Sequence, residues 1–383
     1  MVCCNTNSAF VKKVNPANKN YHILKITRYP PTENRSLRAW TAGDEYVLKR
    51  LESSDIKPET VAISNDRFGY LSCHLHHLQP RIITDRYSQK ISIQKNMRIN
   101  NIEPNSQQWF SPLESLPEKL TLGIIGVPKS MDLFRLYLQQ MHASLDPDGI
   151  VICPFMTRHF SPTMLDIADD YFENRDQGLA RKKSRLLTLS GKKETEQKST
   201  INSLTYKFKN GKEEELKQYY GVFSSGNIDY ATQFLLENLE VKEGENSVID
   251  LASGNGVIGR EIQLQKPDAE LHLVDDSFLA VESSKLNLEP RNTTFHWSDT
   301  LEKFSNSSID LVVSNPPFHF GHENNIEVTV RLFDEVKRVL RKSGRFICVA
   351  NHHLNYKTHL EKSFSRVDRL ASNEKYIVYE CIT

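Results

Sequence analysis

The sequence predicts an α/β fold of two tandem Rossmann-like units, each a mostly parallel sheet flanked by helices. Short apolar runs of strand length alternate with longer amphipathic stretches through both halves of the chain. In the second half, Gly254-x-Gly256-x-x-Gly259 directly follows a buried run, where such folds place a ligand-binding turn. A chain of 383 residues is also long enough to bury two separate cores.

The first half contains a series of short apolar runs that are typical of buried strands. We expect strands within residues 21–29, 61–64, 81–85, 122–126 and 149–153, and helices over 43–51 and 131–145.

The second half repeats the alternation more clearly. Asp229 is placed to cap the N-terminus of a helix that contains Phe234, Leu235 and Leu239. We expect further helices from residue 277 and over 328–340, and strands over 247–251, 271–275, 311–314, 344–349 and 374–382.

The two halves share a spacing but not their polar residues. Asp85 and Gly126 lie 41 positions apart, and Asp275 and Asn315 lie 40 apart. The first half lacks the Gly254–Gly259 turn and has glycine in place of Asn315. We therefore expect a duplicated first unit that has lost its ligand site and now holds substrate.

A basic stretch separates the two halves. Residues 175–212 contain eleven Lys and Arg against three acids, few large apolar residues and no clear period. The stretch is either a solvated linker or a positive strip that meets phosphates, centred on Arg181, Lys182, Lys183 and Arg185, and the two interpretations are compatible. We place the domains at 1–190 and 219–383, with a basic connector over 191–218.

Composition limits the class of protein. The formal net charge is +1, so any basic surface must be local. The six cysteines form no C-x-x-C pair, so we expect reduced thiols and no metal site. The sequence has no apolar run long enough for a membrane span and no apolar signal peptide, so we expect a cytoplasmic protein without membrane contact.

Acidic residues follow consecutive predicted strands of the second half. The glycine turn alone also fits a dinucleotide. However, Asp250 precedes the turn, where a carboxylate suits the ammonium and sulfonium of an amino-acid-bearing cofactor. Asp275, or its neighbour Asp276, is placed to take both ribose hydroxyls, and Asp299 to accept from an adenine amino group. Together these residues favour S-adenosylmethionine as the cofactor.

A rigid strand end completes the pattern. The predicted strand over 311–314 runs into Asn315-Pro316-Pro317-Phe318, and two prolines cannot continue a sheet. An amide, a fixed carbonyl and an aromatic face suit a flat group that carries an amine. The strand end should lie at the ligand edge of the sheet.

Asn-Pro-Pro-Phe after such a turn resembles the class I methyltransferases that act on exocyclic amino groups. Other segments resemble the ribosomal RNA guanine-N2 methyltransferases. They are Leu37–Trp40 with Asp44–Tyr46, Gly221–Ser224 with Asp229, Val274–Ser277, Asn315–His319, Val349–Leu354 and Asn373–Tyr376. The resemblance covers nearly the whole chain and is strongest to the bacterial 23S enzymes, with a degenerate first methyltransferase domain. Ala252-Ser253 departs from the family's usual Gly-Cys, but both residues are small.

The resemblance implies an S-adenosylmethionine-dependent enzyme that methylates N2 of a guanine in 23S ribosomal RNA. Asn315, Pro316 and Phe318 would be catalytic, the first two as acceptors for the amino group and the third by stacking on the base. Phe318 and His319 would contact RNA; the roles of His319 and His322 stay open. The implied cofactor-binding residues are Asp250, Ala252, Gly254, Asn255, Gly256, Asp275, Asp276, Asp299 and Asn315. We expect S-adenosylhomocysteine as product, no metal and a monomer.

The sequence leaves four alternatives to methylation of 23S ribosomal RNA. The same chemistry could act on 16S ribosomal RNA or on a protein glutamine side chain. The chain could also be an RNA-binding pseudoenzyme, although Gly254, Gly256, Asp275 and Asn315 count against that. A nicotinamide dehydrogenase is disfavoured because Asn-Pro-Pro-Phe has no role in hydride transfer.

Overall fold

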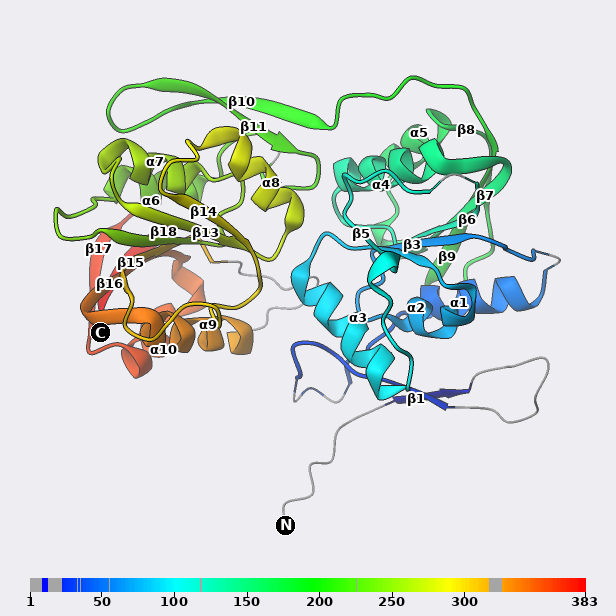
Figure 1. Ribbon diagram of the computed structural model, residues 1–383, viewed down its shortest axis with the longest axis horizontal. Helices are drawn as coiled ribbons and strands as arrows, with labels where there is room; N and C mark the ends of the chain where they lie inside the picture. Colours follow the sequence, from blue (N-terminus) through cyan, green and yellow to red (C-terminus); the bar gives the residue numbers. More distant parts are fainter. Residues whose placement is uncertain are drawn as a thin grey trace, which may run out of the picture. The chain divides into compact units, whose positions relative to one another are not determined.

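The computed structural model describes residues 9–12, 23–32, 34, 36–54, 56–117, 119–224, 226–316 and 326–383. The chain divides into two compact units, Met1–Ser199 and Thr200–Thr383 (Figure 1). Each unit contains, among its described residues, a seven-stranded sheet whose central strands are parallel. This confirms the predicted α/β class. No helix in the described part of the chain is long and apolar enough to cross a membrane.

The first unit is a sheet covered by helices on both faces. Its strand order is β5 (Trp109–Phe110), β4 (Arg81–Ile83), β3 (Val61–Ser64), β6 (Leu120–Ile125), β7 (Leu145–Met156), β9 (Ser184–Lys192) and β8 (Phe172–Gln177). Its helices are α1 (Ala42–Glu52), α2 (Tyr70–His74), α3 (Tyr87–Ile99), α4 (Met131–Ser144) and α5 (Pro162–Asp169). A separate antiparallel pair joins β1 (Ala9–Lys12) and β2 (Ile23–Ile26).

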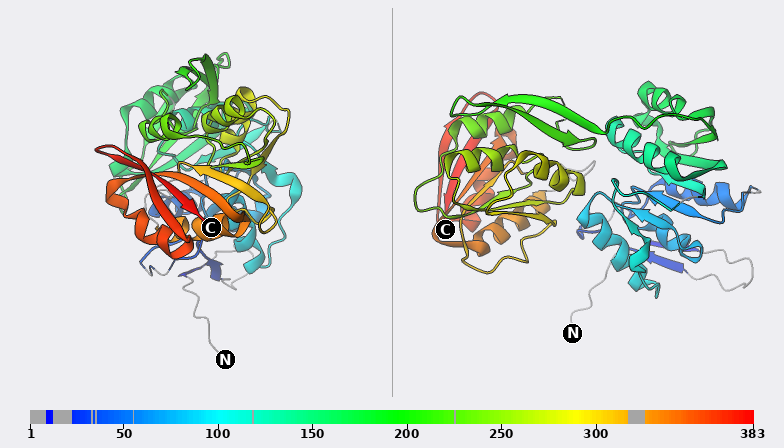
Figure 2. Two further views of the ribbon diagram at one scale, coloured as in Figure 1. Left: turned by 90° about the vertical axis from the view of Figure 1, so that its left-hand side faces the viewer. Right: turned by 45° about the horizontal axis from the view of Figure 1, so that its top comes forward.

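The second unit repeats this strand order. It runs β14 (Thr293–Trp297), β13 (Glu270–Asp275), β12 (Ser247–Leu251), β15 (Ile309–Ser314), β16 (Leu340–Asn351), β18 (Tyr376–Ile382) and β17 (Arg366–Ser372). The helices α6 (Tyr230–Asn238), α7 (Val257–Gln265) and α8 (Phe278–Asn287) cover one face. The helices α9 (Ile326–Val339) and α10 (Tyr356–Ser363) cover the other (Figures 1 and 2).

Each sheet is buried on both faces because alternate residues of its central strands serve two cores. In β12, Val248 packs with residues of α6 and α7, whereas Ile249 packs with residues of α9 and α10. In β3, Ala62 and Ile63 likewise belong to different clusters. These strands must therefore be continuously apolar, and for this reason they could be predicted from the sequence.

The basic stretch over 175–212 contains strands that its sequence did not reveal. The chain forms β9 over Ser184–Lys192, and residues 201–219 form the hairpin of β10 (Ile201–Lys207) and β11 (Glu213–Tyr219). The hairpin belongs to the second unit and lies along α8, where the backbone N–H of Tyr219 donates to Ser283 Oγ at 2.9 Å (Figure 2). The expected connector over 191–218 therefore differs from the structure: residues 193–200 alone separate β9 from β10.

β8 and the hairpin of β10 and β11 escaped prediction because they have little buried surface. β9, in contrast, buries Leu186, Leu187 and Leu189, so limited burial does not explain why it was missed. In β8, only Phe172 is buried, and β10 and β11 bury Leu204, Leu216 and Gln218. Their remaining side chains are mostly polar and are exposed or half-buried, so their composition alone resembles that of a linker.

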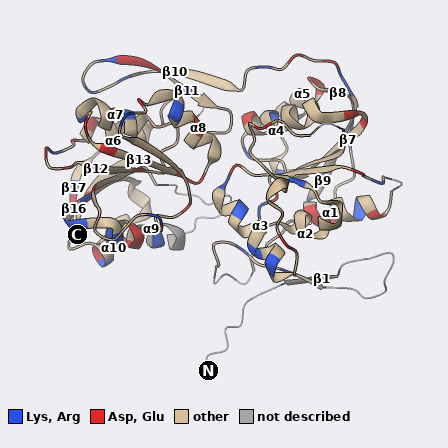
Figure 3. Ribbon diagram, viewed as in Figure 1, with Lys and Arg blue, Asp and Glu red and all other residues tan. Residues whose placement is uncertain are grey.

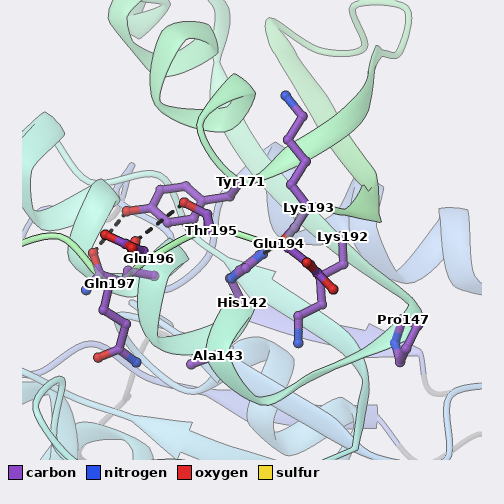
Figure 4. A pocket seen from close by; sticks show the side chains of 11 residues that line it. His142, Ala143, Pro147, Tyr171, Lys192, Lys193, Glu194, Thr195, Glu196 and Gln197 are labelled. Carbon is purple, nitrogen blue, oxygen red and sulfur yellow. Dashed lines mark hydrogen bonds between the residues drawn. The ribbon is translucent and has the colours of Figure 1, made fainter.

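The first unit also contains a cavity of about 570 Å³ (Figure 4). It lies among the C-terminal end of α4, the start of β7 and the segment after β9. Its lining includes His142, whose Nε2 lies 2.9 Å from the carbonyl oxygen of Lys193, and Tyr171, which donates to Gln139 Oε1 at 2.9 Å. This is the amino-terminal edge of the parallel strands, opposite to the edge where such folds bind their ligands.

Candidate active site

The predicted site residues of the second unit lie along one edge of the sheet. The strands β14, β13, β12 and β15 are neighbours and parallel, and their register sets Trp297 beside Asp275, and Leu251 beside both Val274 and Ser314. Asp299, Asp275, the glycine turn and Asn315 follow these four strand ends in that spatial order. The fold thus gathers residues that are up to 61 positions apart in the sequence.

Asn315 is held with its amide oxygen available. Its Nδ2 donates to Thr232 Oγ1 at 2.8 Å and to Asp229 Oδ2 at 3.3 Å. Its Oδ1 is buried and has no hydrogen-bond partner among the described residues. An unsatisfied buried acceptor is costly, so its presence beside a ligand edge is a sign of a missing donor.

The helix α6 fixes this orientation. Asp229 caps it, accepting from the backbone N–H of Ala231 at 3.0 Å and of Thr232 at 3.4 Å, as predicted for this position. The same carboxylate and the Thr232 hydroxyl then accept from Asn315. Sequence reasoning missed Thr232; the spacing Asp229-x-x-Thr232, one helical turn, was the available signal.

The glycine turn is shaped for close approach of a ligand. Ala252, Gly254 and Gly256 have φ of 59°, 56° and 83°. A Cβ on Gly254 would have no heavy atom within 4 Å, whereas one on Gly256 would lie 2.5 Å from Leu288 Cδ1. Gly254 therefore faces open space and Gly256 is required for packing.

Asp250 is a buried acid with one oxygen unused by the described residues. Its Oδ2 accepts from the backbone N–H of Gly259 at 2.9 Å, and its Oδ1 is buried without a partner there. Burial raises the pKa of Asp250 to about 8; the Gly259 N–H lowers that pKa, and the charge of Asp275 raises it. Ser253 Oγ is a further buried atom without a partner in the described chain.

Asp275 and Asn255 organise the turn itself. The Asp275 carboxylate accepts from the backbone N–H of Gly254 at 2.9 Å and of Ser277 at 2.8 Å. Asn255 Nδ2 donates to Gln218 Oε1 at 2.9 Å, which ties the turn to β11. Gln218 was not foreseen, because nothing in its local sequence distinguishes it from other polar residues of an exposed hairpin.

The remaining predicted residues are placed as follows. Asp276 accepts at its backbone oxygen from Trp297 Nε1 at 2.8 Å, and Asp299 follows β14 with a half-buried side chain. Pro316 is buried at the end of β15. Phe318, His319 and His322 lie outside the described residues.

The predicted phosphate strip is a hairpin turn, not a linker. Arg181 to Lys183 connect β8 to β9, and Ser184 and Arg185 begin β9. Lys182 Nζ lies 2.8 Å from Glu45 Oε2, and the Arg181 guanidinium lies 5.9 Å from the centre of the Tyr46 ring. Arg185 Nη1 donates to Gln177 Oε1 at 3.4 Å.

No group of three or more His, Cys, Asp or Glu side chains in the described ranges could hold a metal ion. S-adenosylmethionine, in contrast, fits the residues present. One sheet edge holds the oxygens of Asp250, Ser253 and Asn315 that have no partner among the described residues, together with the open space at Gly254. They offer hydrogen-bond acceptors to a cation that bears an amino acid and a sugar.

Comparisons with known proteins agree with this arrangement. Residues 15–194 match the RLMG N-terminal domain family and residues 213–380 match the Methyltransferase small domain family. The chain is 31% identical over 366 residues to the ribosomal RNA large subunit methyltransferase G of Yersinia enterocolitica, covering 94% of this chain and 92% of the relative. The chain belongs to the ribosomal RNA large subunit methyltransferase G family. This confirms the resemblance that the motifs indicated.

Other relatives of the large subunit methyltransferase G family span the same length. The protein of Psychromonas ingrahamii is 28% identical over 377 residues, covering 94% of this chain and 96% of the relative. Among solved structures, a T. thermophilus 16S rRNA N2 methyltransferase (RsmC), in complex with AdoMet and guanosine, has a TM-score of 0.76 at 20% identity. The match covers 98% of this chain and 98% of the T. thermophilus chain. Its similarity supports the tandem fold of both units.

Proposed function

We propose that this protein transfers a methyl group from S-adenosylmethionine to the exocyclic N2 of a guanine in 23S ribosomal RNA, releasing S-adenosylhomocysteine and, to water, one proton of the amino group. The observation that carries the chemistry is the Oδ1 of Asn315 at the end of β15, beside the glycine turn, which is buried and has no partner among the described residues. Membership of the large subunit methyltransferase G family supports the ribosomal substrate. We further propose a cytoplasmic monomer.

The substrate amine is a poor nucleophile because its lone pair is delocalised into the purine ring. Asn315 Oδ1 and the carbonyl oxygen of Pro316 would accept its two N–H bonds and favour a pyramidal nitrogen. Both acceptors strengthen as positive charge develops on that nitrogen, so they bind the transition state more tightly than the ground state. Thr232 and Asp229 would keep the amide from rotating its nitrogen toward the amine.

Methyl donation is the chemistry that S-adenosylmethionine would supply when bound. Asp250, Ala252, Gly254, Asn255 and Gly256 would line the amino-acid portion. Asp275 or Asp276 would hold the ribose, and Asp299 the adenine. Phe318 would stack on the target base, with His319 beside the RNA, and the base must leave its helix to reach them.

Cofactor affinity should depend on pH through Asp250. In the ligand-free protein its pKa is about 8, so below that pH the carboxyl is mostly neutral. A cationic cofactor favours the carboxylate, so its affinity should rise with pH, by up to about tenfold per unit, and level off above pH 8. Calorimetric titrations from pH 6 to 9 measure this, and Asp250→Asn should flatten the profile. An unchanged slope in that variant would assign the dependence to another group.

Neutralising the turn between β8 and β9 tests its contact with RNA. Glutamine at Arg181, Lys182, Lys183 and Arg185 should weaken binding to 23S ribosomal RNA and lower the slope of log affinity against log salt. Each phosphate contact contributes about 0.7 to 0.9 to that slope. Filter binding at several KCl concentrations gives the slope. A slope equal to that of the wild-type protein would show that this turn has only a structural role and does not contact RNA.

The proposed reaction is tested by mapping methylated guanines in ribosomal RNA from cells with and without the protein. We expect one N2-methylguanine to disappear from 23S RNA when the protein is absent. Loss from 16S RNA instead would support the alternative substrate, which the similar T. thermophilus enzyme methylates. Transfer of labelled methyl groups to protein would favour glutamine N5 methylation.

A further inference from the structure

The first unit lacks the two acids and the amide of the site at the equivalent strand ends. The strand register shows which residues of the two units are equivalent. Ser64 of β3 pairs with Ile83 and Ile125 on its two neighbouring strands. Leu251 of β12 pairs with Val274 and Ser314 in the same way, so Ser64 is equivalent to Leu251. It follows that Ile63, Thr84 and Gly126 occupy the positions of Asp250, Asp275 and Asn315. Thr84, and not the predicted Asp85, is therefore the counterpart of Asp275.

The space between the ends of β3 and β6 is closed in this unit. Asn65, at φ 56°, stands where Ala252 stands at φ 59°, and its Nδ2 donates to the carbonyl oxygen of Gly126 at 2.7 Å. A Cβ on Gly126 would lie 2.9 Å from the carbonyl oxygen of Asn65. The Asn65 side chain thus bridges the ends of β3 and β6, at the positions of Ala252 and Asn315 in the second unit.

Around this closed slot, four adjacent strands are each followed by a basic side chain. Arg67 follows β3, Arg86 follows β4, Lys129 follows β6 and Arg158 follows β7. Three of these positions correspond to Gly254, Ser277 and His353 of the second unit. We refer to Arg67, Arg86, Lys129 and Arg158 as the basic rim.

Three of the four side chains of the basic rim are exposed, and two of their charges act on the same histidine. Arg86, Lys129 and Arg158 are exposed, and the half-buried Arg67 guanidinium lies 4.8 Å from the centre of the Phe68 ring. The pKa of His159 is lowered by burial and by the positive charges of Arg158 and Lys129, which places both charges near one point.

The same loops contain two acids, and both are buried. Asp85 pairs with Arg86, its Oδ2 lying 3.5 Å from Nε, and is itself buried. Asp66 is also buried, and its carboxylate accepts from the backbone N–H and the hydroxyl of Ser72 at 2.7 and 2.8 Å. The helix α3, which starts at the rim, carries Lys and Arg but no acid (Figure 3).

We propose that the basic rim binds consecutive phosphates of the RNA substrate, so that the first unit contacts RNA with the sheet edge that binds the cofactor in the second. Neighbouring strands are about 4.8 Å apart, so four strand ends span about 14 Å. One mononucleotide phosphate cannot reach across that span, whereas a polynucleotide backbone can. The identity of the RNA rests on the proposed function.

The turn between β8 and β9 extends the basic rim. Ser184 pairs with Met156, and the carbonyl oxygen of Lys183 accepts from the backbone N–H of Thr157 at 2.9 Å. Lys182 and Lys183 therefore lie next to Arg158 at the same sheet edge. A strand of RNA along the rim would meet both groups.

The proposal is tested by measuring RNA binding by a variant of the full chain that carries glutamine at Arg67, Arg86, Lys129 and Arg158. The probe is protein-free 23S ribosomal RNA transcribed in vitro, in filter-binding titrations from 50 to 300 mM KCl. We expect at least a tenfold loss of affinity at 100 mM and a salt slope smaller by about 3, since four phosphate contacts are removed. The KM for RNA should rise, while kcat at saturating RNA should stay within twofold.

A matched control carries glutamine at Lys57, Lys95, Arg98 and Lys119. These four exposed residues precede β3 and β6 or lie near the C-terminal end of α3, at the opposite sheet edge. The control changes net charge equally and should retain more of the affinity and the salt slope. Equal losses in the two variants, or none in the rim variant, would overturn the proposal.

Two further measurements separate this proposal from the proposed function. Thermal unfolding must show that the rim variant is folded, and cofactor binding must equal that of the wild-type protein. If the wild-type protein methylates no RNA, the proposed function fails whatever the rim does. If it methylates 23S RNA and the rim variant binds as tightly as wild type, only the rim proposal fails.

Discussion

Replacing Asn315 with alanine is expected to lower the rate of methyl transfer by about 10³-fold while changing cofactor affinity less than threefold. The substitution removes Oδ1, the buried acceptor that lacks a partner among the described residues. Loss of one preorganised group that stabilises transition-state charge typically costs 10² to 10³ in kcat. Single-turnover methyl transfer and calorimetric cofactor titration measure the two effects separately.

Asn238→Ala is the matched control for that result. Asn238 is at the other end of α6, where its Nδ2 donates to the carbonyl oxygen of Phe234 at 2.8 Å, so its loss should leave activity unchanged. Thr232→Val should give an intermediate loss, because Asn315 would keep its oxygen but lose the acceptor that orients it. Near-normal turnover of Asn315→Ala would remove the amide from the mechanism.

Replacing Gly254 with valine is expected to weaken cofactor binding by about 100-fold and to leave the protein folded. A Cβ at Gly254 meets no described heavy atom within 4 Å, so the added side chain would enter the space that the proposed function assigns to the cofactor. The positive φ of 56° adds about 1 to 2 kcal/mol of backbone strain, which a stable domain tolerates. Cofactor titration and thermal unfolding together test the prediction.

Gly256 provides the contrast within the same turn. Its φ is 83°, and a Cβ there would lie 2.5 Å from Leu288 Cδ1 and 3.0 Å from Ser284 Oγ. Gly256→Ala should therefore destabilise the fold by about 2 to 4 kcal/mol through overpacking and strain. Gly244→Val, at an open position, should affect neither measurement. Tight cofactor binding by Gly254→Val would place the cofactor elsewhere.

The strands that lie at the centres of the sheets could be predicted closely. The expected strand over 61–64 is β3, and the expected strand over 247–251 is β12. Such strands are buried on both faces and must be continuously apolar, so their pattern is unambiguous. The hairpin of β10 and β11 could not be found this way, because its few buried residues, including Leu204 and Leu216, are spaced among charged ones.

The candidate site also contains residues that the sequence could predict and residues that it could not. Gly254, Gly256 and Asp250 could be chosen from the sequence because a turn between a strand and a helix requires particular residue types. Thr232 and Gln218 could not, since their contribution is a hydrogen bond to Asn315 and to Asn255, residues 83 and 37 positions away. The same holds for Asn65, whose side chain closes the slot of the first unit by reaching Gly126.

The sequence by itself determined the fold class, the duplicated architecture, the family and the strand end at Asn315, because each is encoded in local residue types and their spacing. Tertiary structure alone decided that Asn315 Oδ1 has no partner among the described residues and that Thr84 occupies the position equivalent to Asp275. It alone also set Arg67, Arg86, Lys129 and Arg158 side by side at one sheet edge. Parallel pairing brings distant strand ends together, and no local pattern records which side chains then meet.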